Sequence, residues 1–269
     1  MNSLTKYKKS FSIGVANSLE YRFDFFIGLI STVFPIIIQV FLWTAIYENS
    51  GKINLYGYTF PQMIMYVFIA GAVGKFVVTG IEFVINDDIH SGGLAKFFIQ
   101  PLSYIPFRML GVIGRKMASM VTMSVLTGIL VVTLGFTIGL SFEPVKVLLF
   151  IPVLISGVIL NFFIFLTISF SAFWLTEVGN FFHAIGVAIM VISGGVFPIE
   201  VMGSTFVAMM KWLPFIYTTN FPIRVISGAV SLNEILMGIT VQMLWIALLA
   251  VVSHIVWKIG IGKYVAVGG

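Results

Sequence analysis

The sequence contains no cysteine, and only 9% of its residues are charged. Without cysteine there is neither a disulfide nor a thiolate metal site. Soluble domains carry roughly 25% charged residues, so this chain has too little polar surface to dissolve as a globular protein. It also lacks the G-x-x-x-x-G-K-[ST] phosphate loop and the H-E-x-x-H zinc motif. The sequence therefore predicts a membrane protein with no catalytic residue, metal site or cofactor of its own.

Hydrophobic residues make up 59% of the chain and gather in long runs. A helix needs roughly 20 residues to cross about 30 Å of hydrocarbon. Six runs of suitable length predict an all-α polytopic membrane protein, folded as a single transmembrane domain over residues 1–269. The six expected transmembrane helices are residues 25–47, 60–85, 117–140, 147–175, 178–198 and 235–257.

Two further segments are apolar without forming a span. Residues 1–24 predict an amphipathic interfacial helix that lies flat on the cytoplasmic leaflet. Its apolar face carries Leu4, Phe11, Val15 and Leu19. Residues 201–232 are interrupted by Lys211, Pro214, Pro222 and Arg224, which leaves two pieces of about ten residues. Neither piece crosses a bilayer, so we expect a re-entrant helical hairpin on the external side, between spans five and six.

The positions of lysine and arginine predict how the chain is oriented. With six spans, ten of these residues fall in segments on one side and four in segments on the other. The richer set comprises residues 1–24, 86–116, 176–177 and 258–269. Cytoplasmic segments carry the excess of positive charge. We therefore expect a multi-pass protein of the cell membrane with both termini in the cytoplasm, and the basic net charge reflects orientation among lipids, not nucleic-acid binding.

Residues 86–116, between spans two and three, carry most of the charge in the middle of the chain. Asp87 and Asp88 are placed to cap and charge-complement the start of a short helix, and Gly92 and Gly93 to break it. Apolar side chains on such an exposed helix would be available to the groove of a partner protein. They are Ile89, Leu94, Phe97 and Phe98.

The second expected span contains two charges, Lys75 and Glu82. A charge at the centre of a span costs at least about 2.5–3.5 kcal/mol. In a continuous helix the two residues would share one face, about 10 Å apart, too far for a direct pair. One interpretation places Lys75 in a translocation path, attracting an anionic or zwitterionic group, and the other has it satisfied by carbonyl oxygens inside the bundle. Asn161 and Gln242, also within spans, are expected to form hydrogen bonds between helices.

Two stretches resemble the motifs of a known family. The first is Asp88-Ile89-His90-Ser91-Gly92-Gly93-Leu94, followed by Gln100-Pro101-Leu102-Ser103-Tyr104. The second is Gly195-Val196-Phe197-Pro198-Ile199, followed by Trp212-Leu213-Pro214-Phe215 and Thr218. They are similar to the D-I-x-x-G-x-L…P pattern of the cytoplasmic loop and to the external re-entrant segment of the ABC-2 type permease family. The order of segments along essentially the whole chain also resembles that family.

The resemblance implies a non-catalytic translocation subunit. Such a subunit pairs with a second permease chain, identical or related, and with a separate ATP-binding subunit that holds ATP and Mg. Coupling to that subunit is assigned to Asp87, Asp88, Ile89, His90, Gly92, Gly93, Leu94 and Phe97. An external gate is assigned to Phe197, Pro198, Trp212 and Pro214. The loop lacks the E-A-A…G pattern of importer permeases, which favours export, and spans rich in Phe and Met favour an amphipathic substrate such as a drug, a lipid-linked molecule or a peptide.

A different class of function stays open. Lys75 and Glu82 would be the working charges of an ATP-independent secondary transporter or channel. Many secondary transporters have inverted repeats with matched broken helices in both halves, whereas the sequence indicates a broken segment in its second half, at residues 201–232. A membrane-embedded assembly factor without transport activity is a third hypothesis.

Overall fold

The computed structural model describes residues 3–20, 22–99, 103–138 and 143–264. The turn expected at residues 100–101 lies outside them. The α-helices are α1 (Ser3–Glu20), α2 (Arg22–Ser50), α3 (Phe60–Val77), α4 (Ile81–His90), α5 (Ala95–Ile99), α6 (Tyr104–Ile138), α7 (Pro144–Ser169), α8 (Gly179–Ile192), α9 (Ser204–Met210), α10 (Asn220–Ile226) and α11 (Leu232–Ile261). Shorter elements are the 3₁₀ helices η1 (Phe170–Phe173), η2 (Ile199–Met202) and η3 (Phe215–Tyr217), and an antiparallel hairpin of β1 (Asn54–Leu55) and β2 (Tyr58–Thr59).

The described part of the chain contains five segments long and apolar enough to cross a membrane. They are Val33–Ser50, Phe60–His90, Tyr104–Ile129, Pro144–Phe173 and Leu232–Ile261. The remaining expected span, residues 178–198, corresponds to α8, whose 14 residues rise only about 21 Å. This is less than the roughly 30 Å of a bilayer core. The structure therefore supports an all-α polytopic membrane protein, and the prediction of six full spans is not confirmed.

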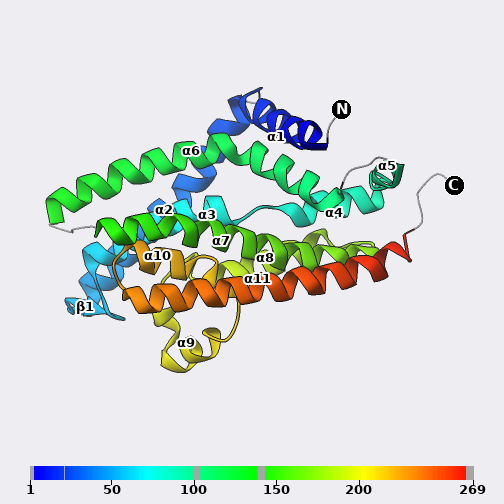
Figure 1. Ribbon diagram of the computed structural model, residues 1–269. Helices are drawn as coiled ribbons and strands as arrows, with labels where there is room; N and C mark the ends of the chain where they lie inside the picture. Colours follow the sequence, from blue (N-terminus) through cyan, green and yellow to red (C-terminus); the bar gives the residue numbers. More distant parts are fainter. Residues whose placement is uncertain (1–2, 21, 100–102, 139–142, 265–269) are drawn as a thin grey trace.

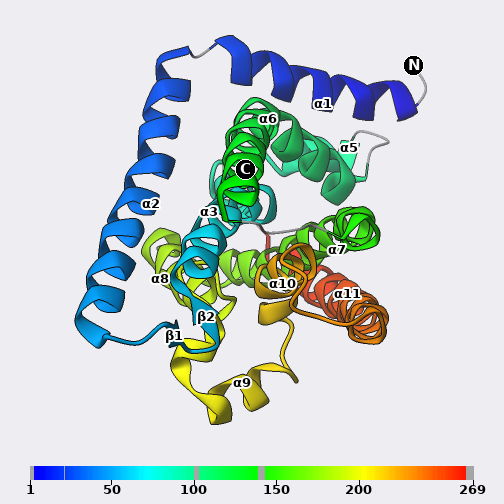
Figure 2. The same ribbon diagram turned by 90° about the vertical axis from the view of Figure 1, so that its left-hand side faces the viewer.

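The long helices form a bundle with α7 at its centre, in contact with α3, α4, α10 and α11. In Figure 1, α7 and α11 run side by side along the length of the molecule. Figure 2 views the bundle from its end and shows α1 and α2 at its outside. On α2, Ile30, Phe34 and Phe41 are 67%, 60% and 71% exposed. Such a row of exposed apolar side chains suits a helix that faces lipid.

The second expected span is broken. Helix α3 ends at Val77 and α4 begins at Ile81, and Gly80 between them has a φ of +71°, which glycine adopts without steric cost. Lys75 and Glu82 therefore lie on different helices, and the expectation that they share a continuous helical face is wrong. The first half of the chain also contains a broken helix, which the sequence did not indicate.

The segment between spans two and three is shorter and more helical than expected. Helix α4 continues to His90, and α6 begins at Tyr104 instead of residue 117. Asp87 and Asp88 consequently lie in the last turn of α4, and the expectation that they cap the start of a helix is wrong. Residues 104–116, which include Arg108, were expected in a loop. They extend the third span toward the end of the bundle where α4 also ends.

Helix α1 crosses α6 at a point where both backbones come close. A Cβ atom on Gly14 would lie 2.6 Å from the Gly111 carbonyl oxygen, and one on Gly114 would collide with the Phe11 carbonyl. The Ser10 hydroxyl donates a 3.0 Å hydrogen bond to the Phe107 carbonyl. Helix α1 is thus held against α6 by a close approach at small residues and by this hydrogen bond.

The segment at residues 201–232 forms two short helices with unlike surroundings. No residue of α9 is buried, and α9 projects from the bundle in both views (Figures 1 and 2). Helix α10 packs against α7 and α3, with Ile223 and Val225 fully buried. Two short helices are present as predicted, but only the second packs into the bundle, so the predicted re-entrant hairpin is not confirmed.

Candidate functional site

Asp88, in the last turn of α4, is the centre of a buried polar cluster. Its carboxylate accepts hydrogen bonds of 2.7 Å from the Tyr104 hydroxyl and 2.6 Å from Arg108 Nε, and its other oxygen pairs with Arg108 Nη2. The Asp88 side chain is 4% exposed and that of Arg108 is 19% exposed. Because both partners lie in the first turns of α6, the cluster joins the end of α4 to the start of α6. Residues 87–99 and 103–108 are called the elbow below.

Two glycines permit the turn inside the elbow. Gly92 has a φ of +76°, in the left-handed region that side chains disfavour. A Cβ atom on Gly93 would lie 2.8 Å from Asp88 Oδ1. The Leu94 amide then donates a 2.9 Å hydrogen bond to the Asp88 carbonyl, so the chain folds back onto α4. The prediction that Gly92 and Gly93 break a helix is confirmed, although the helix they end is α4.

Most apolar side chains of the elbow face the protein interior. Ile89, Leu94 and Phe97 are 6%, 0% and 8% exposed and belong to the largest hydrophobic cluster. The expectation that these three are available to a partner is wrong, because the fold-back packs them against the bundle. Phe98 and Ile99, at the end of α5, are 54% and 85% exposed. They are the large exposed apolar side chains among the residues of the elbow.

The two remaining polar residues assigned to coupling lie nearer the surface. Asp87 is exposed, and His90 is half-buried with its Nδ1 3.0 Å from the Asn86 carbonyl oxygen. The assignment of residues 87–97 to coupling stays a prediction.

An aromatic stack connects the elbow to α11. The Tyr104 ring lies nearly parallel to Trp257, with centroids 5.2 Å apart and an interplanar angle of 12°. Phe97 meets Tyr104 edge-on at 4.8 Å, and the Arg108 guanidinium lies 5.4 Å from the Phe97 centroid. A displacement of the elbow must therefore move α11 or break this stack.

The break between α3 and α4 gathers charged residues from several helices. Lys116 of α6 donates a hydrogen bond to the Val78 carbonyl and lies within electrostatic range of Lys75 and Glu82. Glu82 is 5% exposed, and its Oε2 has no hydrogen-bond partner among the described residues. His183 of α8 also lies within electrostatic range of Glu82. The two predicted charges thus share one cluster with Lys116, which sequence reasoning did not single out.

The four residues assigned to an external gate lie in different surroundings. Pro198 and Pro214 are buried, Phe197 is half-buried, and Trp212 is 82% exposed. Phe197 packs in a cluster with Trp43 near the end of α2, whereas Trp212 lines a cleft beside α11. The structure does not gather them into one constriction, and the gate assignment stays a prediction.

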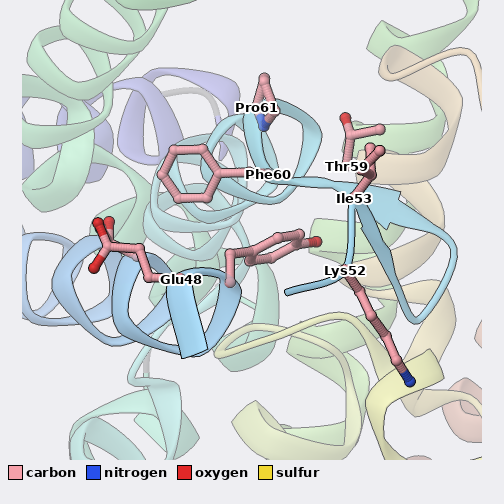
Figure 3. Close-up of a pocket in the computed structure, with 8 residues that line it drawn as sticks. Glu48, Lys52, Ile53, Thr59, Phe60 and Pro61 are labelled. Carbon is pink, nitrogen blue, oxygen red and sulfur yellow. The ribbon is translucent and has the colours of Figure 1, made fainter. Parts of the chain in front are cut away.

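A small pocket of about 440 Å³ lies between the end of α2 and the β-hairpin. The Tyr47 hydroxyl donates a 2.6 Å hydrogen bond to the Tyr58 carbonyl and fixes the hairpin to α2. Burial, reinforced by the Glu200 carboxylate, raises the pKa of the Tyr58 phenol, so it stays protonated. Glu48 and Lys52 at the rim point away from each other (Figure 3). A ligand site has convergent polar groups, and this pocket offers none.

Gln242 of α11 is fully buried and connects three segments. Its Oε1 accepts a 2.7 Å hydrogen bond from the Ser156 hydroxyl, and its Nε2 donates to the carbonyls of Tyr217 and Val153 at 2.8 and 3.2 Å. The interhelical role predicted for Gln242 is confirmed. The same prediction is not confirmed for Asn161, whose buried Oδ1 has no hydrogen-bond partner within the described ranges.

One known family has a sequence pattern that matches most of the chain. The family, described as ABC-2 family transporter protein, matches residues 33–268. The chain belongs to the ABC-2 transporter family. The matched segment contains all five candidate spans and the whole elbow. No curated protein and no solved structure matches the chain.

As an ABC-2 protein, the chain is a multi-pass membrane protein of the transporter class. Over the residues that the structure describes, no group of three or more His, Cys, Asp or Glu side chains is placed to hold a metal ion. Sequence reasoning quoted Tyr104 only as part of a motif and missed the contact of Tyr104 and Arg108 with Asp88, since it placed both in a loop. Their spacing of four was the available signal, because it puts two side chains on one face of a helix.

Proposed function

We propose that this ABC-2 protein is the membrane-spanning subunit of an exporter driven by a separate ATP-binding subunit. The observation that carries the proposal is the family match over residues 33–268, in a chain whose sequence has no phosphate loop of its own. A second permease chain, identical or related, completes the translocation unit. Both termini lie in the cytoplasm, so the elbow faces the ATP-binding subunit, and the substrate is an amphipathic drug, lipid-linked molecule or peptide.

The elbow is suited to transmit force because its contact surface and its anchors are different residues. Phe98 and Ile99 are exposed for docking. Behind them, the Asp88–Arg108 ion pair holds α4 to α6. The stack of Tyr104 on Trp257 extends the connection to α11. In this proposal the ATP-binding subunit displaces α5, and the displacement is passed to α4, α6 and α11 together. The shortened α8 and the α9–α10 segment form the opposite, external side of the path.

Replacing both Phe98 and Ile99 with aspartate is expected to reduce co-purification of the ATP-binding subunit by roughly tenfold or more, as when an apolar anchor of an interface is removed. The measurement is affinity purification of the tagged protein in mild detergent, with mass spectrometry of the proteins that co-elute. Ile53→Asp is the matched control, because Ile53 is 87% exposed at the far end of the bundle. We expect this control to retain the partner fully.

Recovery of a stoichiometric phosphate-loop ATPase with the wild-type chain supports the proposal. Absence of any ATPase from the wild-type sample contradicts it. Retention of the ATPase by the Phe98→Asp/Ile99→Asp variant would leave the partnership intact and refute the role of α5. The two ideas are therefore tested separately.

The ATP-independent transporter has one observation in its favour, the cluster of Lys75, Glu82 and Lys116 at a helix break. Broken helices often carry the ion and substrate sites of secondary transporters. If the cluster forms such a site, membrane vesicles should release a fluorescent amphiphile in the absence of ATP. Lys75→Ala and Glu82→Gln should each abolish this efflux. The exporter proposal expects efflux to require ATP and the exposed face of α5. Undiminished ATP-free efflux in the Phe98→Asp/Ile99→Asp variant would favour the secondary transporter.

A further inference from the structure

A cleft of about 770 Å³ lies between the α9–α10 segment and the first half of α11. Its volume is within the range of sites that hold small amphipathic molecules. Most of its walls are apolar. From α11 they include Met237, Val241, Leu244 and Leu248, and from the opposite side Val207, Ile216 and Phe221.

Two cationic side chains, Lys211 and Arg224, line the same cleft. Both act electrostatically on Glu234 in the first turn of α11, so both lie toward that end of the cleft. The ion pairs within the described part of the chain are Asp88–Arg108 and Glu143–Lys146, and neither involves these two cations. Glu234 itself is held by the amide and hydroxyl of Ser231, at 2.7 and 2.9 Å. The mouth therefore carries two cations against one carboxylate that is already hydrogen-bonded.

The cleft is long enough for one hydrocarbon chain. Fourteen residues separate Glu234 from Leu248, and an α-helix rises about 21 Å over that length. One leaflet of a bilayer has roughly 15 Å of hydrocarbon. Met237, Leu244 and Leu248 are 71%, 65% and 51% exposed, so this side of α11 is open to the membrane along the cleft.

The walls of the cleft are held in place by contacts among the residues that line it and by Gln242 next to them. Phe221 of α10 packs so closely on Gly238 of α11 that a Cβ atom there would collide with its ring. Gln242 links α11 to the Tyr217 carbonyl. Burial raises the pKa of the Tyr217 phenol, which stays protonated and donates a 3.0 Å hydrogen bond to the Lys211 carbonyl. The cleft is thus preformed and does not require the lipid to shape it.

We propose that this cleft binds one phospholipid, with its phosphate at Lys211 and Arg224 and one acyl chain along α11. A phosphodiester supplies the anion that the two cations lack, and charge-assisted hydrogen bonds to phosphate are strong. An acyl chain covers the apolar wall that follows. The site is separate from the elbow and does not depend on ATP-driven export.

The test uses the full chain in detergent, with phosphatidylglycerol brominated on its acyl chains. Native mass spectrometry counts the lipids retained, and bromine quenching of tryptophan fluorescence locates them, because Trp212 and Trp245 both line the cleft. We expect one tightly retained lipid and a saturable quenching component that disappears when both reporters are replaced, in Trp212→Phe/Trp245→Phe. Loss of both cations, in Lys211→Ala/Arg224→Ala, should lower the lipid affinity measured from this component about tenfold. Lys52→Ala, at an exposed lysine, is the matched control.

Val241→Trp fills the cleft without altering its charges and provides a second variant. Loss of the retained lipid in this variant supports the site even where the charge variant folds poorly. Unchanged retention and quenching in either folded variant would overturn the proposal. Brominated diacylglycerol has no phosphate. If it quenched as strongly as brominated phosphatidylglycerol, the proposal would also be contradicted, since the phosphate would then contribute nothing to binding. Displacement of the lipid by inorganic phosphate alone would show that the site recognises the anion without the chain, contrary to the proposal.

Discussion

Replacing Asp88 with alanine is expected to lower the free energy of unfolding by about 3–5 kcal/mol, because removing one partner of a buried ion pair leaves the other charge uncompensated. Arg108 would keep a largely buried guanidinium without its carboxylate, and the Tyr104 hydroxyl would lose its acceptor. The measurement is thermal unfolding of the purified protein in detergent. Trp257 fluorescence is a local reporter, since that ring stacks on Tyr104.

Asp87→Ala is the matched control, since Asp87 is the adjacent carboxylate and is exposed. Surface substitutions change stability by roughly 0.5 kcal/mol or less. The double variant Asp88→Ala/Arg108→Ala should lose less stability than the sum of the two single variants, because the two residues are in contact. Additive losses, or equal losses for Asp87 and Asp88, would show that the pair does not hold the elbow together.

Replacing Gly114 with leucine should separate α1 from α6. Any side chain at Gly114 collides with the Phe11 carbonyl, and forcing extra atoms into a packed contact costs about 1–3 kcal/mol. Because the chain has no cysteine, a single cysteine at Ser10 reports on the contact without background. Ser10 is 8% exposed, so maleimide should label Ser10→Cys slowly in the parent chain and quickly when Gly114→Leu is added.

Gly128→Leu on the same helix is the control, since a Cβ atom there meets nothing within 4 Å. It should leave the labelling rate of Ser10→Cys unchanged. Equal labelling in both glycine variants would mean that α1 is held by the membrane surface and not by α6. In that case the close crossing at Gly14, Gly111 and Gly114 contributes little to the position of α1.

The elbow shows how much of a candidate site the sequence predicted. Gly92 and Gly93 were found because a left-handed turn and a close backbone approach leave a direct mark on residue type. The role of Asp88 was misread, since a carboxylate before a glycine pair is equally compatible with the start of a helix and with its end. The partners of Asp88 lie 16 and 20 residues away. Their spacing of four indicates a shared helix face, but it does not indicate that this face meets Asp88.

The intramembrane charges show the same limit. Lys75 and Glu82 stood out because charges inside apolar runs are rare and costly. The predicted position of Lys75 relative to Glu82 was wrong, because the prediction assumed a continuous helix where Gly80 allows a break. Lys116 was missed since α6 was expected to begin at residue 117, which left this lysine in a loop.

The sequence by itself determined that the chain is a helical membrane protein without a phosphate loop. That conclusion depends on the transfer of apolar and charged groups into lipid, a quantity that adds up residue by residue along the chain. Only the tertiary structure decided which side chains of the elbow are buried, which cations remain unpaired beside α11, and how closely α1 approaches α6. Those properties arise from contacts between residues far apart in sequence, which close packing selects only when the helices are assembled.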